Sequence, residues 1–170
     1  MPGVERCEEC GFTYDEDLAW SAGTAIVGEA HDISQALGSV GDGARFRPTP
    51  ETWSPVEYAC HVRDVLLVQR ERVLLARQVQ NPAPAPMGRD ARAELDGYAE
   101  QEPADVARQL GDAAALFERV LDRLGDDWDR TMTYNFPEPT ERSLRWVAVH
   151  TLHEVVHHRR DIERGLEASP

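Results

Sequence analysis

The stretch with the clearest chemical potential is residues 146–166, WVAVHTLHEVVHHRRDIERGL. It contains four of the six histidines: His150, His153, His157 and His158. Imidazole and carboxylate groups are ligands for divalent metals. The apolar residues of the stretch recur at helical spacing, with Ser143 suited to cap the start and Gly165 suited to the end. The sequence therefore predicts a long helix that carries several metal-ligand side chains.

The direction of these side chains follows from the turn of about 100° between successive helical residues. With Val155 at the centre of the buried face, His158 lies about 60° and Glu154 about 100° from the centre, on the same flank. Since Glu154 and His158 are spaced i, i+4, both can reach one ion. His150 and Asp161 extend this flank outward, so we expect them to orient His158 or a substrate.

A second pattern overlaps the first, because His153, Glu154 and His157 spell H-E-x-x-H. In zinc proteases the two histidines of this motif bind zinc and the glutamate is the base. Here His153 and His157 point about 160° from the centre of the buried face, so we expect them on the polar side next to Arg160 and Arg164. No third-ligand pattern of a protease follows. His153 and His157 remain alternative ligands, and a solvated helix without metal is the other interpretation.

The N-terminal segment contributes a C-x-x-C pair, Cys7 and Cys10. Two cysteines at this spacing can bind a metal, form a redox pair or do neither. The third cysteine, Cys60, is far away in sequence, which excludes a four-cysteine zinc site within one chain. Cys7 and Cys10 could join a histidine ligand or a second chain, or could form a local turn that anchors the N-terminus.

The composition is that of a soluble globular domain, with 170 residues of which 41% are hydrophobic. The net charge of −13 argues against nucleic acid and anionic membrane surfaces as partners. No apolar run reaches the roughly 18 residues of a membrane span, and the N-terminus lacks an apolar signal region. We therefore expect a cytoplasmic protein.

Three further stretches have helical periodicity: residues 14–40, 55–80 and 103–125. The second has the clearest start, because Ser54 can cap it, Pro55 takes the first helical position and Glu57 completes a capping box. We expect a short helix within residues 89–101 and a loop at residues 126–143. No segment has the alternating pattern of a convincing strand. Long helices with long polar connections predict an all-α four-helix bundle. We expect residues 14–168 to form this domain and residues 1–13 to form a separate N-terminal C-x-x-C segment.

His61 lies on the second predicted helix, about 100° from Val62 in the buried stripe of that helix. Metal sites in bundles are built from facing helices, which would bring His61 to Glu154 and His158. Three protein ligands leave a coordination position open, as in catalytic sites. The proline-rich residues 81–88, NPAPAPMG, cannot be helical, and we expect them to cross over the mouth of the site.

Two motifs, W-S-P-V-E-Y-A-C-H-V-R-D at residues 53–64 and E-V-V-H-H-R-R-D-I at residues 154–162, resemble the DinB-like family of bacterial metalloproteins. The resemblance covers residues 14–166 and implies a four-helix bundle with one histidine ligand on the second helix and two ligands on the fourth. Carried over to this chain, these ligands fall on His61, Glu154 and His158.

The usual family pattern has histidine at both later positions. Glu154 in place of the first of them resembles the branch of mycothiol-dependent maleylpyruvate isomerase, in which zinc is held by His, Glu and His. The resemblance implies a divalent ion, Zn²⁺ with Ni²⁺ or another ion as alternatives, and a thiol of the mycothiol type.

The function that this resemblance implies is thiol transfer or isomerisation of a small electrophilic substrate, by a monomer or homodimer. A thiol bound at the open position would be held as a thiolate and act as the nucleophile. Arg63, Arg142 and Arg145 could bind substrate carboxylates. The alternatives are a non-catalytic, stress-associated metal-binding module and a metal-assisted hydrolase that uses the same position.

Overall fold

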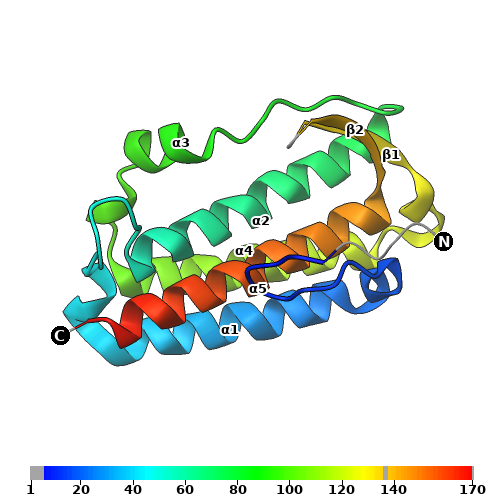
Figure 1. The fold of residues 1–170 in the computed structure, drawn as a ribbon. Coiled ribbons are helices and arrows are strands. Elements are labelled where there is room, and N and C mark those ends of the chain that lie inside the picture. The colour runs from blue at the N-terminus through cyan, green and yellow to red at the C-terminus, as the bar shows by residue number, and fades with distance from the viewer. Residues whose placement is uncertain (1–5, 136–137, 170) are drawn as a thin grey trace.

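Four long helices dominate the computed structural model, which describes residues 6–135 and 138–169. They are α1 (Ala22–Val40), α2 (Pro55–Gln78), α4 (Pro103–Asp122) and α5 (Leu144–Glu167) (Figure 1). The predicted all-α four-helix bundle is therefore confirmed. A 3₁₀ helix, Glu16–Ser21, precedes α1. None of the helices in the described part of the chain is long and apolar enough to cross a membrane.

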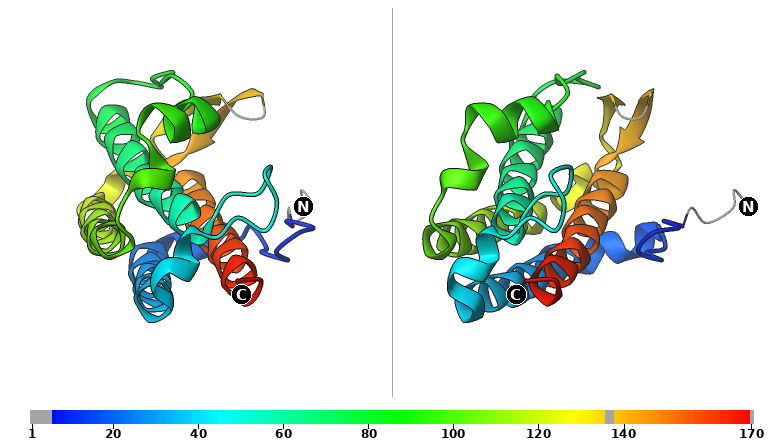
Figure 2. Two further views of the ribbon diagram at one scale, coloured as in Figure 1. Left: turned by 90° about the vertical axis from the view of Figure 1, so that its left-hand side faces the viewer. Right: turned by 60° about the vertical axis from the view of Figure 1, so that its left-hand side comes forward.

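The order of the helices around the bundle is α1, α4, α2, α5 (Figure 2). Helices α1 and α2 follow one another in sequence but lie on a diagonal. After α2, the chain returns along that helix as an extended segment and then forms the short helix α3 (Arg89–Leu95) (Figure 1). Because α1 and α2 lie on a diagonal, α5 packs between them. The flank of α5 beside α2 faces the returning segment across a cavity.

Both helices that carry the predicted ligands begin where the sequence predicts. At α2 the capping box is formed, and the backbone N–H of Ser54 donates to Glu57 Oε2 at 2.9 Å. Arg47 Nε also donates to this carboxylate, at 2.8 Å. At α5 the Ser143 hydroxyl oxygen accepts from the backbone N–H of Trp146 at 3.1 Å. These caps fix the first turn of each helix and hence the register of its side chains.

The prediction of a strand-free loop at residues 126–143 is wrong. Strands β1 (Thr131–Asn135) and β2 (Pro139–Ser143) pair antiparallel before α5 begins. Strand β1 alternates, with Met132 and Tyr134 buried and their neighbours half-buried. Strand β2 is mostly exposed, so its sequence has no apolar alternation by which it could be recognised.

A second correction concerns the face of α5 that was expected to be solvated. Residues 6–14 pack along this face, and the dark-blue trace crosses α5 in Figure 1. The Phe12 ring lies 5.3 Å from the His153 ring, measured between centroids, and His153 is only 9% exposed. The helical projection gave the direction of this side chain, but it could not show that a distant segment covers it.

Helices α2 and α5 approach closely where the N-terminus of one meets the C-terminus of the other. A Cβ atom on Gly165 of α5 would lie 3.0 Å from Cγ of Pro55, the first residue of α2. This distance is shorter than ordinary van der Waals contact, so a side chain at position 165 would have to displace the Pro55 ring.

We predict that Gly165→Val destabilises the protein by about 1–3 kcal/mol, because the branched side chain would push against the rigid Pro55 ring. The matched control is Gly111→Ala on α4, where a Cβ atom would meet nothing within 4 Å. This change should stabilise the fold by about 0.5–1 kcal/mol through helix propensity. Both values can be measured by denaturant unfolding, and an unchanged midpoint for Gly165→Val would contradict the packing argument.

Candidate metal centre

The structure brings the three predicted ligands together. Potential ligand atoms of His61, Glu154 and His158 all lie within 4.8 Å of one another. The His158 Nε2 atom is 3.8 Å from Glu154 Oε2, and the centroids of the His61 and His158 rings are 4.8 Å apart. His61 comes from α2 and the other two residues come from successive turns of α5. The site is thus built between facing helices, as the bundle requires.

The two imidazoles are buried, with His61 3% and His158 7% exposed. Burial, together with the neighbouring His158, lowers the pKa of His61 to about 3, so this ring is neutral at ordinary pH. Neutral imidazole is the form that binds metal ions. Within residues 6–135 and 138–169, nothing forms a hydrogen bond with the buried His61 Nδ1.

Asp161 orients one of the ligands. Its Oδ2 atom lies 2.8 Å from His158 Nδ1, which leaves His158 Nε2 on the side of Glu154. Burial alone would raise the pKa of Asp161, but the hydrogen bond with His158 lowers it below the ordinary value. A carboxylate on the second nitrogen of a ligating histidine is the usual arrangement at metal sites. This contact agrees with the orienting position expected for Asp161.

The donor set fits a divalent ion. It consists of two imidazoles and one carboxylate, which suits Zn²⁺ and also other first-row divalent ions such as Ni²⁺. An unpartnered buried nitrogen on His61 and a fixed ring at His158 are what a site prepared for an ion would show. Three protein ligands leave room for a further ligand.

A cavity of about 600 Å³ adjoins the three ligands. Its wall includes His61, Glu154 and His158 together with residues of α2, β1 and the extended segment after α2. Pro86 and Met87 lie on this wall, in agreement with the expected crossover at the mouth of the site. The cavity therefore gives access to the position where a further ligand would bind.

His150 lies on the same cavity wall, beside Glu154 rather than His158. Its Nε2 atom is 3.9 Å from Glu154 Oε1, and its Nδ1 atom is 2.9 Å from the Tyr14 hydroxyl oxygen. The ring stacks on Trp146 with centroids 4.6 Å apart. Burial lowers the pKa of His150 to about 3, so the ring is neutral. Tyr14 and Trp146 thus hold a neutral imidazole at the edge of the site.

Sequence reasoning missed Arg72, a cation on the cavity wall. Its guanidinium lies over the Tyr134 ring, 5.2 Å from the centroid, and donates to the Ala85 carbonyl at 2.8 Å. None of the ion pairs among the described residues involves Arg72. The helical spacing could have indicated this position, because Arg72 follows His61 by about three helical turns and therefore lies on the same face of α2.

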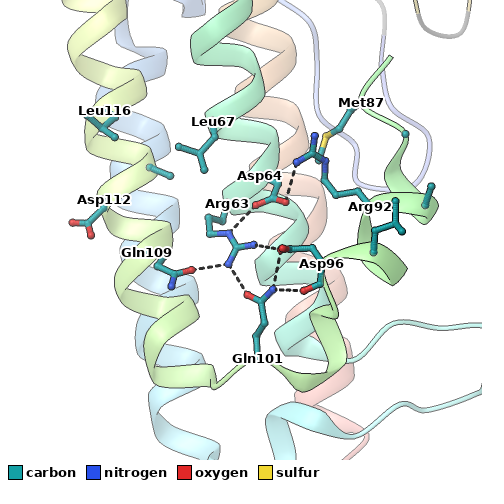
Figure 3. Close-up of a pocket in the computed structure, with 14 residues that line it drawn as sticks. Arg63, Asp64, Leu67, Met87, Arg92, Asp96, Gln101, Gln109, Asp112 and Leu116 are labelled. Atoms are coloured by element: carbon teal, nitrogen blue, oxygen red, sulfur yellow. Dashed lines mark hydrogen bonds and ion pairs between the residues drawn. The ribbon is translucent and has the colours of Figure 1, made fainter. Parts of the chain in front are cut away.

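Arg63, predicted to bind substrate, lies in a different cavity of about 910 Å³ (Figure 3). Its guanidinium donates to Asp64 Oδ1 at 2.8 Å, to Gln101 Oε1 and Gln109 Oε1 at 2.6 Å each, and to Asp96 Oδ2 at 3.2 Å. These acceptors use four of the five guanidinium N–H groups and link α2 to α4 and to the chain after α3. The surroundings of Arg63 are thus those of a structural side chain.

The other two arginines also lie away from the three ligands. Arg145 forms an ion pair with Asp129, with Nη2 to Oδ1 at 3.1 Å, and its guanidinium lies over the Trp20 ring. The Arg142 guanidinium lies over the Trp146 ring at 4.5 Å. Neither residue lines the cavity beside His61. Substrate binding by Arg142 and Arg145 stays a prediction from the sequence.

The alternative ligands form a second cluster, which adjoins the first. Cys7, Cys10, His153 and His157 have potential ligand atoms within 4.8 Å of one another. His153 and His157 are both within reach of the cysteines, whereas Glu154 is within reach of His61 and His158 and also of His150 and His153. The only group among the described residues that holds both His153 and His157 also holds the two cysteines, which disfavours the protease arrangement.

A comparison with family models matched residues 26–162 to the DinB superfamily. The chain belongs to the DinB superfamily. Among solved structures, YfiT from Bacillus subtilis matches with a TM-score of 0.78 and 16% sequence identity, over 96% of this chain and 93% of YfiT. That protein is described as a probable metal-dependent hydrolase with an unusual four-helix bundle topology. At this identity the likeness shows the fold alone. A comparison with curated proteins gave no significant match.

We predict that this DinB-superfamily chain loses its ion at the three-ligand site when His61 is changed to Ala, because two ligands on one helix cannot replace the third. The measurement is Zn²⁺ content after dialysis, made in a Cys7→Ser, Cys10→Ser background that removes the neighbouring thiols. His31→Ala is the control, since His31 is exposed on α1. Equal zinc in the His61 and His31 variants would contradict the assignment.

Proposed function

We propose that the chain is an enzyme in which His61, Glu154 and His158 hold Zn²⁺. The enzyme transfers a low-molecular-weight thiol of the mycothiol type to a small electrophile, or uses this thiol to isomerise the electrophile. The observation that supports this most directly is the position of the three ligands on the wall of a cavity of about 600 Å³. This volume is within the range of cofactor and substrate sites.

The charge of the ligand set supports an anionic fourth ligand. Two neutral imidazoles and one carboxylate leave one positive charge on a divalent ion, which a single thiolate would neutralise in a buried site. When bound, the ion would lower the pKa of a coordinated thiol enough to hold it as a thiolate at neutral pH. Glu154 provides the carboxylate, and it is also the residue that matches the thiol-using branch.

The cavity wall would position the rest of the thiol and the electrophile. Val65, Val68 and Met87 supply apolar surface, while Arg72 supplies a cation that donates to the Ala85 carbonyl and forms no ion pair within the described part of the chain. Arginine binds carboxylates through two parallel hydrogen bonds. In a transfer, the sulfur forms a bond to the electrophilic carbon while the leaving group departs with its electron pair, and the thiol proton passes to solvent.

Metal-assisted hydrolysis is the second candidate. Water could occupy the same position as the thiol, and His150 Nε2 lies 3.9 Å from Glu154 Oε1 at the edge of the site. The description of YfiT as a probable metal-dependent hydrolase also supports this alternative. Turnover that does not require a thiol would favour hydrolysis, and metal binding without turnover would favour a non-catalytic module.

We predict that a mycothiol-like thiol binds Co²⁺ at this site directly. Titration of the thiol into the Co²⁺-loaded Cys7→Ser, Cys10→Ser, Cys60→Ser variant should produce a sulfur-to-cobalt charge-transfer band that grows as pH rises and the thiol deprotonates. The triple variant is needed because the protein's own thiols would give a similar band.

The control for this titration is the same variant with His61→Ala, which should show no band because it no longer holds the ion. Methylated thiol provides a second control, since it cannot form a thiolate. A folded, Co²⁺-loaded triple variant without any spectral response would contradict thiol transfer and favour the hydrolase or the non-catalytic module.

We predict that Arg72→Gln raises KM for a carboxylate-bearing electrophile by about 10- to 100-fold while kcat changes little, because one charge-assisted interaction is lost. Maleylpyruvate is the first electrophile to test, given the resemblance noted above. Arg70→Gln is the matched control, since Arg70 is on the same helix but pairs with Glu71 and does not line the cavity. Equal KM values for the two variants would exclude this role for Arg72.

A further inference from the structure

The N-terminal segment forms a tight hydrogen-bonded turn around the C-x-x-C pair. Arg6 and Thr13 pair as an antiparallel bridge, and the N–H of Cys7 donates to the Phe12 carbonyl at 2.8 Å. The N–H of Gly11 donates back to the Cys7 carbonyl at 2.8 Å, with Gly11 at a φ of 72°, a conformation that glycine adopts without steric cost. The C-x-x-C pair lies within this turn and is not joined as a disulfide.

His153 of α5 offers this turn a nitrogen with no other partner. Its Nδ1 atom lies 2.8 Å from the Tyr14 hydroxyl oxygen, so Nε2 is the nitrogen left for the cysteines. Within the described residues, Nε2 is buried and has no hydrogen-bond partner. His153 is only 9% exposed, and an unsatisfied buried nitrogen costs about 1–3 kcal/mol. The unpartnered His153 Nε2 therefore indicates that a ligand binds here.

His157, one turn further along α5, completes the cluster. Its Nδ1 atom is 3.7 Å from Cys7 Sγ. The opposite nitrogen, Nε2, is 3.3 Å from Glu9 Oε2 and 3.8 Å from Asp161 Oδ2. Ligating histidines usually donate their second N–H to such a carboxylate, which fixes the ring. Both histidines thus have one nitrogen held by an oxygen and the other available to a metal.

We propose that Cys7, Cys10, His153 and His157 bind a second Zn²⁺ in a closed, tetrahedral structural site. Two thiolates balance the charge of the ion and two neutral imidazoles add none, so the buried site is neutral overall. Binding would release the two thiol protons. All four positions are filled by protein, so this site offers no place for a substrate.

This second site would fix the position of Tyr14 against α5. The zinc would fasten residues 7–10 to α5, and Tyr14 follows four residues later, with its hydroxyl oxygen 2.9 Å from His150 Nδ1. His150 in turn lies on the wall of the cavity at the first metal site. The second ion would therefore stabilise the wall of the first site without taking part in its chemistry.

Zinc stoichiometry of the full chain tests the proposal. The wild-type protein, prepared with reductant and dialysed after Zn²⁺ loading, should hold two ions. Cys7→Ser, Cys10→Ser should hold one, and His61→Ala should also hold one. Cys60→Ser is the matched cysteine control and should hold two, because Cys60 is a buried thiol outside the cluster. A single ion that is lost only in His61→Ala would overturn the second site, whereas a single ion lost only in the cysteine variant would overturn the first.

Cobalt spectroscopy of His61→Ala isolates the second site. This variant should show sulfur-to-cobalt charge transfer and tetrahedral absorption without any added thiol, and Cys7→Ser, Cys10→Ser in the same background should abolish both. His153→Gln should weaken Co²⁺ binding by about tenfold or more, or about 1.4 kcal/mol. Chelation should speed hydrogen exchange at the Cys7 and Gly11 amides. Absence of the band, or a Cys7–Cys10 disulfide under reducing conditions, would overturn the site.

Discussion

Desolvation of the histidines along α5 is the constraint on which the rest of the structure depends. Burial lowers the pKa of His150 to about 3 and that of His153 to about 4, so these rings remain neutral at physiological pH. A neutral ring has one donor and one acceptor nitrogen, and each needs a partner when it is buried. Tyr14 and Asp161 supply partners on one side of the rings. His61 Nδ1 on α2 and His153 Nε2 are buried and have no partner among the described residues, so each carries an uncompensated cost that a ligand would relieve.

The rotation of α2 about its axis decides whether His61 meets α5. Arg63, two residues away, is 7% exposed and is bound on the opposite side of the helix by Asp64, Gln101 and Gln109 (Figure 3). A buried ion pair of this kind adds little net stability, but its directional hydrogen bonds specify one arrangement. Arg63 therefore helps to hold α2 in the rotation that brings His61 to α5, although Arg63 itself does not line the cavity beside His61.

The parts of this structure that could be predicted are those that depend on local spacing. The capping box at Ser54 and the helical period fix where α2 and α5 begin and which faces they bury. The i, i+4 spacing of Glu154 and His158 then places both beside the buried stripe. The docking of residues 6–14 and the pairing of β1 with β2 depend on partners distant in sequence or on exposed strands without apolar alternation. The surroundings of His153 could not be predicted for the same reason, because the segment that buries it is about 140 residues away.

The H-E-x-x-H motif is then explained as an overlap of two i, i+4 pairs. His153 and His157 form one pair, and Glu154 and His158 form the other, shifted by one residue and so rotated by about 100°. The first pair is within reach of the N-terminal cysteines and the second is within reach of His61 on α2, although His153 and His157 also line the cavity beside His61. Asp161 lies 3.8 Å from His157 Nε2 and 2.8 Å from His158 Nδ1, so it contacts a histidine of each pair. One helix can carry two candidate ligand pairs because two of its flanks are buried by different parts of the chain: residues 6–14 cover one and α2 covers the other. The H-E-x-x-H pattern arises here because one residue of the second pair falls between the two residues of the first.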